Sequence, residues 1–147
     1  MLIYADTNIY ARPFDDQSQL RIRIEAEAGL ALFDLLSRTP KLRLAASDIL
    51  LYEIENASVL KRNGMMRFLP LATVHVRQTT AIREKARSLM KHTGLHPRDA
   101  LHLASAMRIQ AELFLTCDEH FYRGAVGDMV GTIRIINPTQ FPFHQYL

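Results

Sequence analysis

Residues 2–9 read LIYADTNI, an apolar run that ends on a carboxylate. The first four residues, Leu2–Ala5, predict a short buried strand. Asp6 follows directly, and an aspartate in this place is ordinary as a turn residue or as the cap of a following helix. It is also suited to a ligand site, because parallel sheets bind ligands beyond the carboxyl ends of their strands. The rest of the chain has to decide between these interpretations.

Strands and helices are predicted to alternate along the chain. Apolar runs bounded by turn residues predict further strands at 42–46, 71–76, 113–115 and 132–136. Apolar residues at helical spacing predict helices at 20–37, 48–63, 79–92 and 97–110, with Gly64 and Gly94 ending the second and third. This alternation predicts an α/β fold of three layers, with a central parallel sheet of four or five strands flanked by helices. The length predicts a single domain, residues 1–147.

The composition narrows the class of protein. Hydrophobic residues make up 48% of the chain and charged residues 22%, which is typical of a globular domain. A single cysteine excludes an intramolecular disulfide and favours a reducing, cytoplasmic environment. No apolar run approaches the ~20 residues of a membrane span, so we expect no membrane association. The net charge of +3 is compatible with a polyanionic partner such as RNA.

Four acidic residues lie where simple solvation does not explain them: Asp6, Glu53, Asp99 and Asp118. Each alone has an ordinary explanation, as a helix cap, a complement to a helix dipole or an exposed helix residue. Two of them, Asp6 and Asp118, follow predicted strands, so a parallel sheet would bring both to the same edge. Gathered carboxylates repel one another, and burial raises their pKa values unless a cation compensates. Hard oxygen ligands of this kind suit Mg²⁺ or Mn²⁺, and Asn8 and Thr116 could support them.

Four segments in this order resemble the PIN domain family, which includes the VapC-type toxins of toxin–antitoxin pairs. They are IYADTNIY (3–10), SDILLYEIE (47–55), HPRDALHLASA (96–106) and LFLTCDEHF (113–121). The resemblance extends from Leu2 to about Phe141 and implies a PIN-like domain with metal-dependent ribonuclease activity. It implies that Asp6, Glu53, Asp99 and Asp118 are the metal-holding acidic quartet, supported by Asn8 and Thr116. Glu55 stays an alternative to Glu53, which is preferred because it follows Ser47 by six residues.

The implied reaction is hydrolysis of an RNA phosphodiester by a water that a bound Mg²⁺ or Mn²⁺ activates. The expected products carry a 5′-phosphate and a 3′-hydroxyl, and the number of metal ions stays open. Arg12 and Arg98 are candidates for holding flanking phosphates, although an exposed charged face is the ordinary explanation for either. A small antitoxin is a possible partner. A homodimer is expected from two apolar segments, residues 65–69 and the tail FPFHQYL.

Two alternatives stay open from the residues. A metal-free ribonuclease would use a histidine pair as acid and base. Of the six histidines, His102 follows Asp99 by three residues on one predicted helix, and we interpret it as a packing or supporting residue. The other alternative is a PIN-like scaffold that binds RNA or protein with little or no cleavage. Intact acidic residues argue against this scaffold without excluding it.

Overall fold

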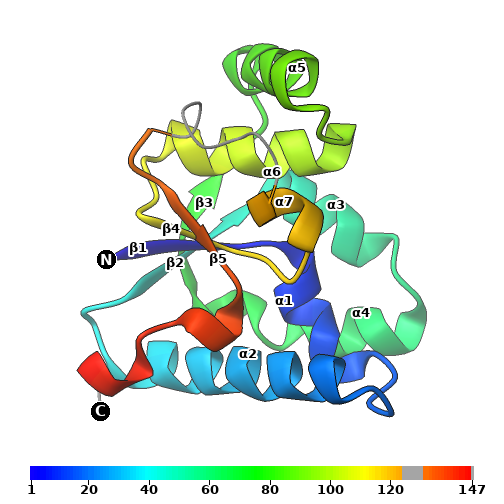
Figure 1. The fold of residues 1–147 in the computed structure, drawn as a ribbon, viewed down its shortest axis with the longest axis vertical. Coiled ribbons are helices and arrows are strands. Elements are labelled where there is room, and N and C mark those ends of the chain that lie inside the picture. The colour runs from blue at the N-terminus through cyan, green and yellow to red at the C-terminus, as the bar shows by residue number, and fades with distance from the viewer. Residues whose placement is uncertain (124–130, 147) are drawn as a thin grey trace.

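The computed structural model describes residues 1–123 and 131–146, and its centre is a five-stranded sheet (Figure 1). The strands are β1 (Leu2–Ala5), β2 (Arg43–Ser47), β3 (Ala72–Val76), β4 (Leu113–Leu115) and β5 (Arg134–Ile136). Their order is β3-β2-β1-β4-β5, and every neighbouring pair is parallel. The predicted α/β fold with a parallel central sheet is therefore confirmed.

Helices cover both faces of the sheet. They are α1 (Thr7–Ala11), α2 (Leu20–Arg38), α3 (Asp48–Glu55), α4 (Val59–Met66), α5 (Thr80–Thr93), α6 (Pro97–Arg108) and α7 (Glu119–Arg123). In Figure 1, α5 and α6 lie on one side of the sheet, and α1 and α2 lie on the other. The period-two alternation of β1 supplies both layers, because Tyr4 packs into the core beneath α5 and α6 while Ile3 packs into the core beside α2.

The strand order places a switch point between β1 and β4. The chain builds β2 and β3 on one side of β1 and then crosses over to build β4 and β5 on the other side. The Asp6 amide continues the β1–β4 ladder by donating to the Leu115 carbonyl at 2.9 Å. Ligands of open parallel sheets bind in the crevice beyond such a point. Asp6 and Asp118 leave the sheet at this place, next to each other.

The predicted helix at 48–63 is wrong in its extent. The structure has two helices, α3 and α4, separated at residues 56–58. The Asn56 side chain donates to the Tyr52 carbonyl at 2.7 Å, and the Ser58 hydroxyl caps α4 by accepting from the Lys61 amide at 3.4 Å. Gly64 lies inside α4 instead of ending it. A Cβ at this position would lie 2.4 Å from Cζ of Phe14, so the packing of that ring requires glycine.

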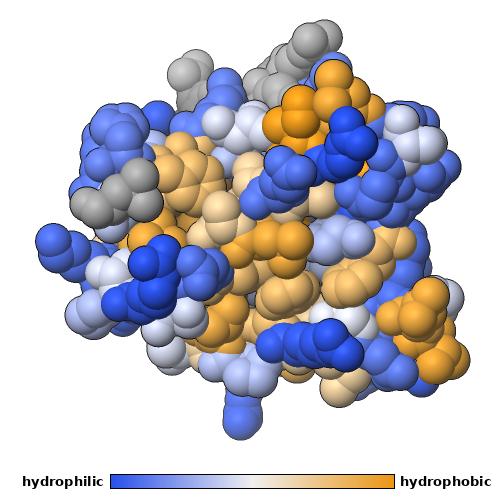
Figure 2. Space-filling model, turned by 90° about the horizontal axis from the view of Figure 1, so that it is seen from below, coloured by the Kyte–Doolittle hydropathy of each residue, from blue (hydrophilic) through white to orange (hydrophobic). Residues whose placement is uncertain are grey.

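The two apolar segments that suggested a homodimer fold largely onto the core. Met65 is 2% exposed and Phe141 is 4% exposed, whereas Met66 is half exposed. Other exposed apolar residues lie on α2, among them Leu20 and Ile24. Figure 2 views the molecule from below, the side on which α2 lies in Figure 1, and shows apolar side chains gathered over the middle of that face. No helix within the described ranges is long and apolar enough to cross a membrane.

Candidate active site

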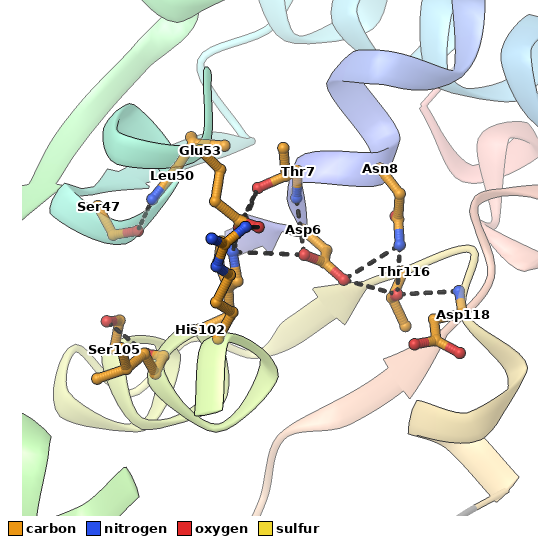
Figure 3. A network of polar contacts seen from close by, with 12 residues as sticks. Asp6, Thr7, Asn8, Ser47, Leu50, Glu53, His102, Ser105, Thr116 and Asp118 are labelled. Carbon is orange, nitrogen blue, oxygen red and sulfur yellow. Dashed lines mark hydrogen bonds and ion pairs between the residues drawn. The ribbon is translucent and has the colours of Figure 1, made fainter. Parts of the chain in front are cut away.

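Asp6 is a buried carboxylate that neutral donors hold in place (Figure 3). It caps α1, and its Oδ1 accepts a hydrogen bond from the Thr7 amide at 2.8 Å. Its Oδ2 accepts from the Thr116 hydroxyl at 2.9 Å and from the Asn8 amide group at 3.1 Å. Burial raises the pKa of Asp6, and His102, Thr116 and Thr7 offset only part of this effect. The carboxylate is therefore rigid, and its charge is incompletely compensated.

Asn8 and Thr116 connect the segments that follow β1 and β4. The Asn8 amide group donates to the Thr116 hydroxyl at 3.1 Å, and Asn8 Oδ1 accepts from the Cys117 amide at 3.0 Å. The Asp118 amide in turn donates to the Thr116 hydroxyl oxygen at 3.1 Å. The two predicted supporting residues thus orient Asp6 and fix the backbone on which Asp118 lies. Thr116 joins both acids in one network, as the dashed lines in Figure 3 show.

Glu53 reaches the same place from α3. Its Oε1 accepts from the Thr7 hydroxyl at 2.8 Å and also pairs with Nε2 of His102. Partial burial alone would raise the pKa of Glu53, but the hydrogen bond and charge of His102, the Thr7 hydroxyl and nearby Arg98 lower it. Glu55 lies exposed on the same helix. Of the two glutamates, the structure therefore brings Glu53 to Asp6.

His102 is almost fully buried and lies between two carboxylates and a tyrosine. Besides its contact with Glu53, Nε2 is 3.6 Å from Oδ1 of Asp6. On the other side of the ring, Nδ1 pairs with the Tyr4 hydroxyl at 2.6 Å, which in turn pairs with the Ser47 hydroxyl at 2.6 Å. Burial lowers the pKa of His102, but Asp6 and Glu53 more than reverse this effect, so the pKa is raised overall. A positively charged imidazole therefore fits this environment.

The other two acids adjoin this group. Asp99 lies in the first turn of α6, and Asp118 follows β4 and accepts from the His120 amide at 2.9 Å. Burial and the negative charges of Asp6 and Asp118 raise the pKa of Asp99 to about 6. Among the described residues, Asp6, Glu53 and His102 form a potential ligand set whose ligand atoms lie within 4.8 Å of one another, and Asp99 and Asp118 are not part of it. A cation bound among the acids would remove the repulsion that raises the pKa of Asp99.

The two predicted phosphate-binding arginines differ in their surroundings. Arg98 is largely exposed, with Nη1 3.9 Å from Oε2 of Glu53. Arg12 is already paired with Asp15 at 3.1 Å and with the buried Glu25 at 3.2 Å. Because two carboxylates already compensate its charge, Arg12 is less suited to hold a phosphate than Arg98. Arg12 nevertheless lines an open groove of about 510 Å³ that also includes Asn8 and Asp118.

Sequence reasoning missed Tyr4 and Thr7 and interpreted His102 as a packing or supporting residue. Tyr4 lies two residues before Asp6, and side chains two residues apart along a strand point to the same side. The sequence could therefore have predicted that Tyr4 lies on the same side as Asp6. His102 follows Asp99 by one helical turn, which was the available signal that it points to the same place. Thr7 carried no signal, because its role comes from a contact with a residue 46 positions away.

Comparison with known proteins identifies similar chains. A model of the PIN domain family matches residues 3–127. The VapBC2 structure from Rickettsia felis bound to a promoter DNA fragment is similar with a TM-score of 0.62 and 16% identity, over 93% of this chain and 98% of that chain. VapBC-1 from nontypeable Haemophilus influenzae is similar with a TM-score of 0.60 and 18% identity, over 95% of this chain and 100% of that chain. A toxin–antitoxin complex from Klebsiella pneumoniae is similar with a TM-score of 0.55 and 20% identity, over 92% of this chain and 97% of that chain. No curated protein sequence matches the chain.

Removing the Tyr4 hydroxyl tests the buried network. Tyr4→Phe leaves His102 and Ser47 without their shared partner, so we expect it to lower the free energy of unfolding by ~1–3 kcal/mol. Tyr10→Phe is a matched control, because Tyr10 is equally buried and its hydroxyl has no hydrogen-bond partner within the described residues. We expect this variant to stay within ~0.5 kcal/mol of wild type. Urea unfolding measures both, and equal effects of the two substitutions would contradict the network.

The raised pKa of Asp99 predicts a pH-dependent gain in stability on its removal. The pKa is about 6 in the folded protein against 3.8 for an unperturbed aspartate, so the folded state holds this proton more tightly. Its contribution to stability is therefore complete below the unfolded pKa and is lost as the pH rises through about 6. In EDTA at pH 7.5, we expect Asp99→Asn to be more stable than wild type by ~1 kcal/mol, a value discounted for partial exposure.

The difference in the free energy of unfolding between Asp99→Asn and wild type should shrink as the pH falls towards 4, where the Asp99 carboxyl of the wild type is protonated and neutral like the asparagine. Urea unfolding across this pH range measures it, with the exposed Glu55→Gln on α3 as a control. A constant difference between Asp99→Asn and wild type at all pH values would show that the pKa of Asp99 is not raised in the folded protein.

Proposed function

Because the chain belongs to the PIN domain family, we propose that it is a metal-dependent endoribonuclease that hydrolyses RNA phosphodiesters. One observation carries the proposal: carboxylates from β1, α3, α6 and the end of β4 converge at the switch point of the sheet. Their mutual repulsion destabilises the fold unless a cation is bound. Metal binding therefore explains why the carboxylates are gathered here. PIN nucleases use divalent metals, in agreement with this donor set.

The donor chemistry favours a hard cation. We propose that Asp6, Asp99 and Asp118, together with Glu53, hold Mg²⁺ or Mn²⁺, because carboxylate oxygens suit these ions. When bound, such an ion would neutralise charge on the phosphodiester and activate a water for in-line attack. His102 is better suited to orienting Glu53 than to binding Mg²⁺, since its Nε2 already pairs with that carboxylate.

The protein's own groups keep the acids in position. Thr116 and Asn8 both donate to Oδ2 of Asp6, and the Thr7 amide donates to Oδ1, so this carboxylate does not rotate away from the site. Thr7 and His102 hold one oxygen of Glu53, and Arg98 lies near its other oxygen. Such fixed oxygens favour catalysis, because the geometry is prepared before the substrate binds.

The toxin–antitoxin complexes among the similar structures suggest a biological role. We propose that this chain is the toxin of such a pair, that it acts in the cytoplasm and that a small antitoxin neutralises it. A short reading frame beside its gene would support this role, and an isolated gene would contradict it.

A PIN-like scaffold that binds RNA or protein without cleavage is the second candidate. The compensated state of Glu53, which pairs with His102 and adjoins Arg98, is the observation that favours it. The half-buried charge of Asp99 beside Asp6 and Asp118 favours the nuclease instead, since a scaffold gains nothing from this repulsion.

Cleavage of labelled single-stranded RNAs tests the nuclease proposal. We expect wild type to cut in Mg²⁺ or Mn²⁺, to leave 5′-phosphates and to stop cutting in EDTA. Asp99→Asn removes a carboxylate that faces two others and should reduce the rate at least ~100-fold. Glu55→Gln is the matched control, because it changes an exposed acid two residues after Glu53 on α3 and should cut like wild type.

Cutting that survives both EDTA and Asp99→Asn would favour a histidine mechanism over the metal mechanism. Uncut RNA in every condition, with tight RNA binding, would favour the scaffold.

We also propose that the chain forms a homodimer through the apolar face of α2. Leu20 and Ile24 are exposed there and would be buried by a second copy. Sedimentation at micromolar concentration should give twice the chain mass of 16.8 kDa, and Ile24→Glu should shift it to a monomer. A wild-type monomer under these conditions would contradict the proposal.

A further inference from the structure

Tyr52 and Arg98 form an exposed pair at the rim of the acidic site. Tyr52 is 51% exposed, and the Arg98 side chain is 59% exposed. Cζ of Arg98 lies over the ring, 5.6 Å from its centroid. Tyr52 directly precedes Glu53 on α3, and Arg98 directly precedes Asp99 on α6. We call these two side chains the rim pair.

The helical geometry explains this place. Successive residues on a helix project about 100° apart, so when Glu53 and Asp99 point into the site, the residues before them point to its edge. Each of the two helices, α3 and α6, thus contributes one acid to the site and one residue to its rim. Nη1 of Arg98 is 3.9 Å from Oε2 of Glu53, so the rim pair and the acids are continuous.

Stability alone accounts poorly for the rim pair. An exposed cation–π contact contributes only ~0.5–1 kcal/mol. Arg98 lies in the first turn of α6, where the helix dipole disfavours a positive charge. A large aromatic ring half in solvent also leaves apolar surface exposed to water. The arrangement is better explained as one half of a contact that a ligand completes.

The chemistry of the pair specifies that ligand. An aromatic ring and a guanidinium plane are the two groups on which unpaired nucleobases stack in single-stranded RNA. The positive charge is also useful here, because the neighbouring carboxylates would otherwise repel the phosphates on either side of that base. Bases within a duplex are stacked on each other and have no free face for such a contact.

We propose that the rim pair is a stacking platform for one unpaired nucleobase of single-stranded RNA, next to the phosphate that lies in the acidic site. This inference rests on the proposed function, since it names how the substrate of the same site is held. Tyr52 supplies the stacking surface. Arg98 extends this surface and contacts the adjoining phosphate.

Equilibrium binding to a labelled single-stranded RNA in EDTA tests the platform without requiring cleavage. Tyr52→Ala should weaken binding about tenfold, which is within the range measured for one stacked base. Tyr52→Phe keeps the ring and should bind like wild type. Arg98→Ala should weaken binding and lower the salt dependence by about one phosphate contact, whereas Arg98→Lys should retain that salt dependence. Arg38→Ala is the matched control, because Arg38 is similarly exposed at 61% and lies at the far end of α2.

A scan of abasic sites through the RNA identifies the stacked base. At one position, removing the base should weaken wild-type binding about tenfold and weaken Tyr52→Ala less than twofold, because the two changes remove the same contact. If Tyr52→Ala binds RNA like wild type, the platform proposal is overturned. If the variant loses the same factor at every abasic position, no base stacks on Tyr52 and the proposal also fails.

This result is independent of the nuclease proposal. A protein that never cuts RNA but shows the position-specific abasic effect has the platform and lacks the activity. A protein that cuts with Mg²⁺ but shows no such effect has the activity and lacks the platform.

Discussion

The buried carboxylate of Asp6 is the constraint on which the site depends. Removing a carboxylate from water is unfavourable unless hydrogen bonds replace the lost solvation. Here the Thr7 amide, the Thr116 hydroxyl and the Asn8 amide group supply those bonds. They come from the segments after β1 and β4, so satisfying one carboxylate also joins the two strands at the switch point. The donors are neutral, and this leaves a negative charge for a ligand to use.

The site divides into a compensated half around Glu53 and an uncompensated half around Asp99. Glu53 has a lowered pKa, because His102, Thr7 and Arg98 outweigh its partial burial. Asp99 has a raised pKa, because burial and the charges of Asp6 and Asp118 act on it together. A divalent ion would gain most from the uncompensated half, where it relieves repulsion. The compensated half then acts as a fixed support whose position the buried chain of Ser47, Tyr4 and His102 determines.

The topology connects this electrostatic arrangement with the surface around it. α3 and α6 each place one acid inside and the preceding residue at the rim, so the charge cluster and the Tyr52–Arg98 pair are consequences of the same two helices. The open groove that includes Asn8, Arg12 and Asp118 adjoins the other side of the cluster. An extended chain that crosses the acids would therefore meet an aromatic and cationic rim on one side and a polar groove on the other.

Local patterns in the sequence were enough to predict the parallel sheet and the helical layers on its two faces. Strands and helices depend on residues a few positions apart, and apolar runs and helical spacing record those preferences directly. The four acids were recognisable because two of them follow strands whose carboxyl ends must share an edge. Short-range patterns did not reveal α1, which Asp6 caps, or the division of residues 48–66 into two helices.

Tertiary contacts decided the rest. Gly64 predicted a helix end, but the Phe14 ring, 50 residues earlier, is what requires a glycine inside α4. The orientation of Glu53 rather than Glu55 towards Asp6, and the chain from Ser47 through Tyr4 to His102, join residues 43 to 98 positions apart. Spacing along a sequence records the preferences of neighbours. It does not record which side chains meet when distant segments pack, and the packing sets the burial and the charge of this site.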